Sequence, residues 1–165
     1  MNLNNKTVVV TGASAGIGWQ CALDFCKAGA RVIGIGRNPA RCQDAEQKIR
    51  AQVPDADLHY LIADLASQKQ IHTCAEKIST LLKEKGLSAL DVLVNNAGVY
   101  MGKKTFAEDG IETTFAVNHL APFLLTHLLL PLLSKSSDGR VITVSSDSHY
   151  NTLLFPERAK NPPFY

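Results

Sequence analysis

The sequence predicts an α/β protein in which a parallel β-sheet is covered by helices on both faces. Short apolar runs rich in β-branched residues recur along the chain. Because these runs are nearly continuous rather than alternating, they are typical of strands buried on both sides. Helical patterns separate them, and repeated strand–helix–strand units imply crossover connections and a parallel sheet. The runs are Val8–Val10, Val32–Ile35, Leu58–Ile62, Val92–Val94 and Val141–Val144.

The spacing of apolar residues predicts the helices. Residues 71–82 place apolar side chains at the i, i+3, i+4 and i+7 positions of an amphipathic helix. A second pattern covers Ile17–Ala28, and Gly29 stands where a left-handed C-terminal cap belongs. We expect a third helix after Pro39 and a fourth from about Glu108 to Ser134.

Length and charge limit the class of function. The 165 residues fit one domain, and a net charge of +2 is too small to make nucleic acid or an anionic membrane the main partner. Met1–Thr11 lacks the layout of a signal peptide. The apolar run Leu120–Leu133 has only 14 residues and contains two prolines, which is short for a membrane span. These features favour a cytoplasmic protein.

Cysteines and histidines do not predict a metal site or a disulfide framework. The four cysteines are widely spaced and form no CxxC pair, and the histidines lack the spacing of metal ligands. Cys21 and Cys74 fall on the apolar faces of predicted helices. We therefore expect both to be buried, unreactive thiols.

A glycine-rich turn follows the first predicted strand and opens the first helix. It reads Thr-Gly-Ala-Ser-Ala-Gly-Ile-Gly over residues 11–18. In a dinucleotide-binding turn, Gly12 would permit the tight bend, Gly16 would let the backbone approach a pyrophosphate, and Gly18 would let the helix pack on the strand. A turn that merely connects two elements is the alternative, but three glycines at this spacing are costly in conformational entropy. No Gly-Lys-Ser/Thr follows, which excludes a P-loop.

The end of the second strand indicates which dinucleotide is preferred. Folds that hold a ribose 2′-hydroxyl place an Asp or Glu there, whereas this chain has Gly36 and Arg37. A guanidinium offers several donors to a 2′-phosphate, so we predict NADP(H) rather than NAD(H). A solvated arginine at a helix start is the alternative.

Four further motifs occur in order along the chain, each at the end of a predicted strand or in a predicted helix. They are Asp64-Leu65, Asn95-Asn96-Ala97-Gly98, Val117-Asn118-His119-Leu120 and the segment 140–146 that ends in Ser145-Ser146. Together with the turn, they resemble the short-chain dehydrogenases/reductases, and most closely the branch that includes retinol-dehydrogenase-like enzymes. The resemblance implies a Rossmann-type doubly wound sheet with strand order 3-2-1-4-5.

The resemblance also implies roles for individual residues. Asn118 and Ser146 match catalytic-site positions of the family, Asn118 supporting a proton relay and Ser146 orienting the substrate carbonyl. The cofactor-binding positions implied by the turn, the arginine and the family motifs are Gly12, Ser14, Gly16, Ile17, Gly18, Arg37, Asp64, Leu65, Asn96, Ala97 and Gly98.

The position of a proline supports the role of Asn118. Pro122 lies four residues later and has no N–H to donate to the Asn118 carbonyl, so the helix should kink and leave that oxygen free. In the family, this main-chain carbonyl holds a water of the proton relay. The alternative is an asparagine that only accommodates a kinked helix.

Ser146 could also be interpreted as a nucleophile. It stands at the C-terminal end of a parallel strand, where α/β proteins bind ligands. A hydrolase triad of Ser146, Asp147 and His149 is disfavoured, because these residues are crowded in sequence and no GxSxG elbow is present.

The family's general acid is absent from the chain. Family members carry a Tyr-x-x-x-Lys pair after the serine, in which the lysine lowers the pKa of the phenol. Tyr100 and Lys104 have this spacing but precede Asn118. Residues 147–165 are polar, contain three prolines and predict an irregular tail. We therefore expect a single domain over 1–165 that lacks the C-terminal third of the family domain, with Val141–Val144 on an uncovered sheet edge.

The sequence thus predicts an NADP(H)-dependent oxidoreductase that transfers a hydride between nicotinamide and a small alcohol or carbonyl substrate. The alternative is an inactive fragment that at most binds the dinucleotide. A nucleotide-sugar epimerase is disfavoured, because its turn normally reads TGxxGxxG. The apolar residues between Leu124 and Leu132 indicate core packing or a dimer interface, and we expect the full-length form to be a homo-oligomer.

Overall fold

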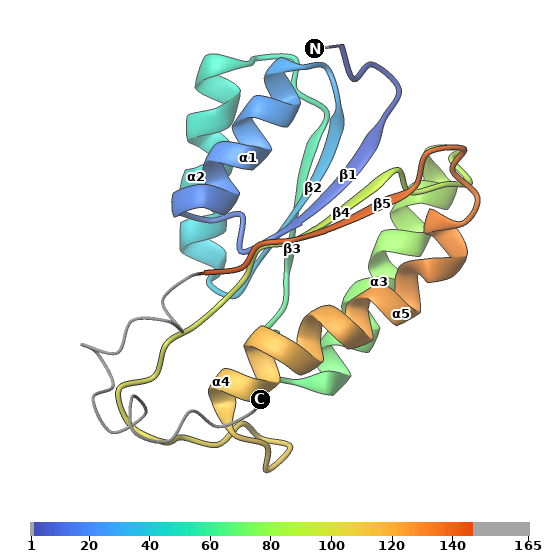
Figure 1. Cartoon of the computed structure of the whole chain (residues 1–165). Coiled ribbons are helices and arrows are strands. Elements are labelled where there is room, and N and C mark those ends of the chain that lie inside the picture. Colours follow the sequence, from blue (N-terminus) through green and yellow to red (C-terminus); the bar gives the residue numbers. More distant parts are fainter. Residues whose placement is uncertain (1, 147–165) are drawn as a thin grey trace.

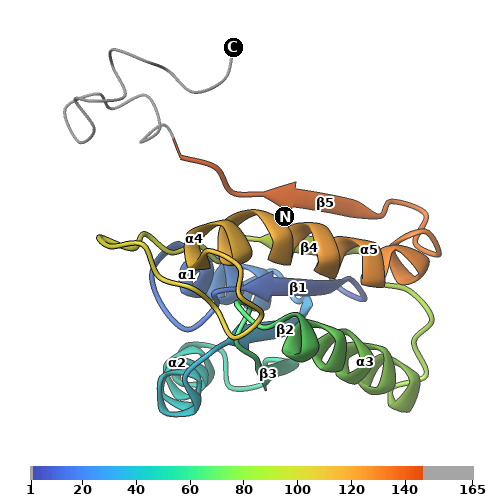
Figure 2. The same cartoon turned by 90° about the horizontal axis from the view of Figure 1, so that it is seen from below.

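The five predicted strands form one parallel sheet in the computed structural model, which describes residues 2–146. Its order is β3-β2-β1-β4-β5, as the resemblance implied (Figure 2). The observed ends of each strand lie within one residue of the predicted ends. The strands are β1 (Thr7–Thr11), β2 (Arg31–Gly36), β3 (Leu58–Ile62), β4 (Val92–Asn95) and β5 (Arg140–Thr143).

Helices cover both faces of this sheet (Figure 1). On one face lie α1 (Gly16–Lys27) and α2 (Pro39–Gln52), and on the other lie α3 (Gln68–Glu84) and α5 (Ala121–Leu133). Gly29, which follows the end of α1, has a φ of 85°, the left-handed conformation expected of a C-terminal cap. Residues 2–146 therefore form the predicted doubly wound α/β fold.

Alternation along the central strand β1 creates two cores. Val9 points to the α3/α5 side, where it joins a cluster that includes Ile78 and Leu129. Val8 and Val10 point to the α1/α2 side. All three valines have no exposed surface, which explains why β1 reads as an uninterrupted apolar run.

The fourth predicted helix differs from the expectation. The helical segment starts at α4 (Thr113–Phe115), five residues later than predicted, and continues as a π-helical turn, η1 (Ala116–Leu120), before α5. The Ala121 N–H bonds to the carbonyl of Ala116, five residues back. Pro122 lies in the first turn of α5, so the predicted interruption takes the form of a widened turn, a feature often found at functional sites.

The joined segment Thr113–Leu133 has 21 residues and a mean hydropathy of 1.5, enough to cross a membrane by length and composition alone. The apolar run Leu120–Leu133, with 14 residues, is therefore shorter than the helical segment that contains it. A core helix meets the same criterion, and one stripe of α5 is buried against α3 and the sheet. The buried residues are Ala121, Leu125, Leu129 and Leu133.

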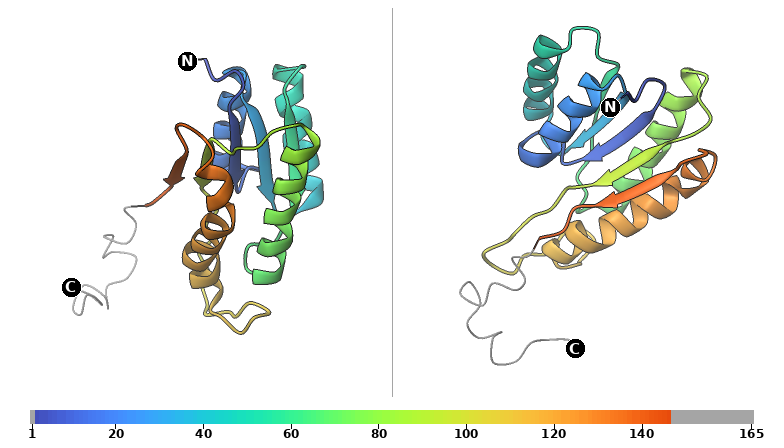
Figure 3. Two further views of the ribbon diagram at one scale, coloured as in Figure 1. Left: turned by 90° about the vertical axis from the view of Figure 1, so that its right-hand side faces the viewer. Right: turned by 45° about the horizontal axis from the view of Figure 1, so that its top comes forward.

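Strand β5 is the exposed edge that the sequence predicted. It lies at the end of the sheet, and no further strand pairs with it within residues 2–146 (Figure 3). Val141, Ile142 and Val144 are 44%, 45% and 40% exposed, respectively. An apolar strand edge of this kind invites pairing with another chain.

The cysteines match the prediction only in part. Cys74 is buried, and burial raises its pKa to about 11, so it is a neutral thiol. Cys21, predicted to be buried as well, is only partly covered, because its position on α1 is at the margin of the apolar stripe. All four cysteines are free thiols.

Candidate active site at the carboxyl edge of the sheet

A cavity of about 290 Å³ lies where the carboxyl ends of the strands meet. β2 and β3 lie on one side of β1, and β4 and β5 lie on the other, so the order of the strands reverses between β1 and β4. α/β proteins bind ligands beside such a reversal. The cavity is lined by residues at the carboxyl ends of four strands, by the first turn of α2 and by one residue of η1. The lining residues are Gly12, Ser14, Ile35, Gly36, Arg37, Asn38, Arg41, Ala63, Asp64, Leu65, Ala97, Gly98, Val99 and Val117.

The turn from β1 to α1 has the geometry of a phosphate-binding loop. Gly12 and Gly16 have φ of 68° and 56°, a region that favours glycine. A Cβ on Gly16 would meet no described atom within 4 Å, so the backbone there is open to a ligand. Ala15, which caps α1, gives no side-chain cap to the helix within the described chain, so the first N–H groups of α1 can face an anion.

The side chain of Asn96 fills the space between the other two glycines. Its Nδ2 would lie 3.0 Å from a Cβ on Gly12 and 2.4 Å from a Cβ on Gly18. The same Nδ2 donates a 2.9 Å hydrogen bond to the carbonyl of Thr11. Gly18 therefore admits both the Asn96 side chain and the Gly12 carbonyl, in addition to bringing α1 close to the sheet.

Thr11 joins the ends of β1 and β4 through its hydroxyl. Its Oγ1 accepts hydrogen bonds of 2.9 Å from the backbone N–H groups of Asn96 and Ala97, and donates to the carbonyl of Val94. Thr11 is only 2% exposed, so these bonds are shielded from water. They hold the segment after β4 against the glycine-rich turn.

Arg37 and Arg41 give one side of the cavity a positive charge. Arg37 is 68% exposed and lies 3.9 Å from a carboxylate oxygen of Asp64, measured from Nη1. Such a loose, exposed ion pair contributes little to stability and leaves the guanidinium available to another anion. Asn38 caps α2 by accepting a 3.0 Å hydrogen bond from the Arg41 N–H, which places Arg41 in the first turn beside the cavity.

Gly36 is required by packing at the end of β2. A Cβ there would lie 2.4 Å from the sulfur of Cys42 and 3.3 Å from the Cβ of Ser14. Burial raises the pKa of Cys42 and the Arg41 charge lowers it, with burial the larger effect, so the thiol is neutral. Gly36 thus brings α2 and the glycine-rich turn close to the start of the Arg37 loop.

Asn118 binds the backbone of the segment that follows β4. Its Oδ1 accepts a 2.8 Å hydrogen bond from the Val99 N–H, and its Nδ2 donates a 2.9 Å bond to the Val99 carbonyl. Both partners belong to one residue, so this pair fixes the position of Val99 and, with it, the adjoining Gly98 at the cavity wall.

Ser146 lies beyond the end of β5. The ladder continues past the strand, since the Val144 N–H donates to the Asn95 carbonyl at 2.9 Å. Ser146 follows two residues later at the same edge of the sheet and is exposed. Asp147 and His149, the partners in the disfavoured triad, lie outside the described residues, as does the predicted tail 147–165.

The cavity includes seven of the eleven predicted cofactor-binding residues. Those not on its lining are Gly16, Ile17, Gly18 and Asn96, of which Ile17 is 66% exposed at the start of α1. Seven lining residues were not predicted to bind the cofactor, although Gly36 stands beside Arg37 in the sequence and Val117 belongs to a family motif: Ile35, Gly36, Asn38, Arg41, Ala63, Val99 and Val117. Arg41 could have been found from its place in the first turn after Arg37, but the others are ordinary residues brought there by the fold.

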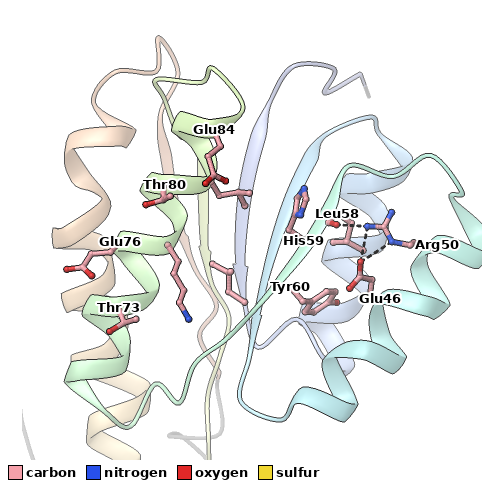
Figure 4. A pocket seen from close by; sticks show the side chains of 12 residues that line it. Glu46, Arg50, Leu58, His59, Tyr60, Thr73, Glu76, Thr80 and Glu84 are labelled. Carbon is pink, nitrogen blue, oxygen red and sulfur yellow. Dashed lines mark hydrogen bonds and ion pairs between the residues drawn. The ribbon is translucent and has the colours of Figure 1, made fainter.

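A larger groove of about 660 Å³ lies elsewhere, over the outer edge of β3 between α2 and α3 (Figure 4). Arg50 occupies one end of it, donating to the carbonyl oxygens of Ala56 and Leu58 while bound to Glu46. No group of three or more metal-ligating side chains occurs within residues 2–146, in this groove or in the cavity. The groove holds none of the predicted catalytic or cofactor residues.

The parallel sheet, the glycine-rich turn and the cavity at the strand ends are the features of the dinucleotide-binding class of α/β fold. A family model described as short chain dehydrogenase matches residues 6–153, and the chain belongs to this family of oxidoreductases. Among curated relatives, retinol dehydrogenase 13 of Homo sapiens is 42% identical over 144 residues, which are 87% of this chain and 42% of the relative. The WW domain-containing oxidoreductase of Gallus gallus is 40% identical over 148 residues, 90% of this chain and 34% of the relative.

Solved structures show the same fold. The Pseudomonas aeruginosa RhlG/NADP active-site complex superposes with a TM-score of 0.73 at 28% identity, covering 96% of this chain and 69% of that one. A short chain dehydrogenase from Shigella flexneri in complex with NADP gives a TM-score of 0.74 at 28% identity, over 90% and 62% of the two chains. The present chain spans less than half the length of the curated relatives named above.

Proposed function

We propose that this chain binds NADP(H) at the carboxyl edge of its sheet, as part of an oxidoreductase that interconverts an alcohol and a carbonyl compound. The observation that carries the proposal is the cavity between the glycine-rich turn and the arginines of the β2–α2 connection. Complexes of two structural neighbours with NADP and the retinol dehydrogenase names of several relatives support it.

The residues present fit a dinucleotide phosphate. The open backbone at Gly16 and the uncapped N-terminus of α1 suit the pyrophosphate, with Gly12, Gly18 and Asn96 holding the turn in shape. Arg37 suits a 2′-phosphate, and the loose pairing with Asp64 leaves it able to turn toward one.

The remaining predicted residues take the following roles in the proposal. Leu65, Ala97 and Gly98 form apolar walls of the cavity. Asn118 fixes that wall and supports a proton relay, and Ser146 orients the substrate carbonyl by donating a hydrogen bond. The nicotinamide supplies the hydride, and the protein's part is to bind, orient and exclude water.

We further propose that residues 1–165 by themselves bind the dinucleotide without catalysing turnover, because they contain no Tyr-x-x-x-Lys pair between Ser146 and residue 165. We also propose that the protein acts in the cytoplasm and that its full-length form self-associates. Exposed apolar residues of α5 support self-association, with Phe123 70% and Leu130 51% exposed.

Fluorescence titration of the 165-residue chain with NADPH tests the binding proposal. We expect saturable enhancement of nicotinamide fluorescence, together with no NADPH oxidation when an aldehyde is added. Absence of saturable binding would overturn the binding proposal, and steady NADPH oxidation would overturn the proposal that the chain does not turn over.

A further inference from the structure

Tyr60 connects the outer edge of the sheet to the glycine-rich turn. It lies on β3, yet its hydroxyl donates a 2.8 Å hydrogen bond to the carbonyl of Ala13, 47 residues away in sequence. Figure 4 shows its ring beside β3 in the groove between α2 and α3. The side chain therefore spans from that groove, across β2, to the loop that borders the candidate cofactor cavity.

A glycine in β2 makes this path possible. Gly34 pairs with Tyr60 in the sheet, and a Cβ on Gly34 would lie 2.7 Å from Cε1 of the tyrosine ring. Any side chain at this position would push the ring away from β2. Gly34 was not assigned a role by the sequence, and the structure shows that it provides the space in which the ring lies.

Ala13, whose carbonyl accepts this hydrogen bond, is bound through its N–H as well. Ala13 has no exposed surface, and its own N–H donates to the carbonyl of Ile35 at 3.1 Å. Burial raises the pKa of Tyr60, so the phenol keeps its proton and remains a donor at neutral pH. The bond to β2 therefore fixes the Gly12–Ala13 peptide unit, and the bond from Tyr60 fixes the next unit, between Ala13 and Ser14.

The orientation of this peptide unit matters for the cavity. In a trans peptide, the carbonyl and the following N–H point in opposite directions. Because Tyr60 binds the Ala13 carbonyl, the Ser14 N–H points away from the tyrosine. Ser14 and Gly12, on either side of Ala13, both line the candidate cofactor cavity.

We propose that Tyr60 is a positioning residue for phosphate binding, holding the Ala13–Ser14 peptide so that the turn is preorganised for the pyrophosphate. This inference rests on the proposed dinucleotide binding. Tyr60 does not line the candidate cofactor cavity, so its proposed contribution is to the shape of the turn alone. Its loss lowers the affinity for ligands that reach the turn. It leaves unchanged the affinity for ligands that occupy only the adenosine and 2′-phosphate positions.

The test compares NADPH with adenosine 2′-monophosphate, which has no phosphate on its 5′ side. Tyr60→Phe keeps the ring and removes only the hydroxyl. We expect it to weaken NADPH binding about three- to tenfold, as loss of one hydrogen bond predicts, and to leave adenosine 2′-monophosphate binding unchanged. Thr80→Val is the control, since it removes a hydroxyl from the same groove without a bond to the turn.

Each outcome separates the inference from the proposed function. If the wild-type chain does not bind NADPH, the proposed function fails and this inference fails with it. If the wild type binds NADPH and Tyr60→Phe binds it equally well, only the role of Tyr60 is overturned. Equal weakening of both ligands by Tyr60→Phe would indicate general destabilisation, and would also overturn the positioning role.

Discussion

The side-chain Nδ2 of Asn96 donates a 2.9 Å hydrogen bond to the carbonyl oxygen of Thr11 and lies in the space that a side chain on Gly18 would need. The asparagine after β4 and the last glycine of the turn are thus one packing unit. The glycine is required by this neighbour even before any ligand binds.

Gly18→Ala is therefore expected to destabilise the fold. The added Cβ would lie 2.4 Å from both Asn96 Nδ2 and the Gly12 carbonyl, and overpacking of this kind costs about 1–3 kcal/mol. Urea unfolding measures the change. Gly102→Ala is the control, because no described atom lies within 4 Å of its Cβ, and an equal effect of the two substitutions would contradict the packing role.

Asn118 provides a second prediction. Asn118→Ala removes both hydrogen bonds to Val99 and should loosen the cavity wall, lowering NADPH affinity about threefold to tenfold. Asn118→Asp retains the acceptor for the Val99 N–H but sets a carboxylate against the Val99 carbonyl, so it should not restore affinity. Wild-type affinity in Asn118→Ala, measured by the same titration, would contradict this role.

The sequence was sufficient for the strands, because a short apolar run marks each of them, although β1 and β2 are buried along nearly their whole length whereas β5 is exposed at the edge. It was also sufficient for Gly29, whose cap position depends on local backbone geometry. It was insufficient for the π-helical turn at 116–120, since Pro122 signals an interruption but not its form. Val99 and Val117 could not be predicted as cavity residues, because their place on the wall depends on how η1 meets the segment after β4.

The hydrogen bonds of Asp91 imply that the stability of the fold depends on pH. It joins the opposite end of β1 to the β5 connection, accepting from the Thr7 N–H at 2.8 Å, the Ser136 hydroxyl at 2.7 Å and the Lys6 ammonium at 3.0 Å. Burial raises its pKa, but these donors outweigh burial and hold the pKa below the usual value of 3.8.

A depressed carboxyl pKa stabilises the fold above the unfolded-state pKa and ceases to do so as pH falls through the folded-state value. Asp91→Asn should therefore lower the free energy of unfolding by about 1–3 kcal/mol at pH 7. The difference from wild type should shrink below about pH 4, the ordinary pKa range of an aspartate. Urea unfolding between pH 3 and pH 7 checks this prediction, and a constant difference across that range would contradict it.

The exposed edge of the sheet predicts self-association. Ile142→Lys places a charge on β5, where Ile142 is 45% exposed, and should slow aggregation of the chain measured by light scattering. Phe106→Lys is the control, since Phe106 is 62% exposed but lies outside the strands. Equal slowing by both substitutions would show that general surface charge, rather than the strand edge, controls association.

In the proposed function Arg37 makes this cavity an NADP(H) site, and the ratio of NADPH to NADH affinity in Arg37→Asp tests this role most directly. Lys77→Asp, on the exposed face of α3, makes the same change in charge away from the cavity. We predict that Arg37→Asp lowers the ratio about tenfold or more, as the loss of a charge-assisted bond to phosphate implies, and that Lys77→Asp leaves it unchanged. Unchanged NADPH and NADH affinities in Arg37→Asp would contradict the account.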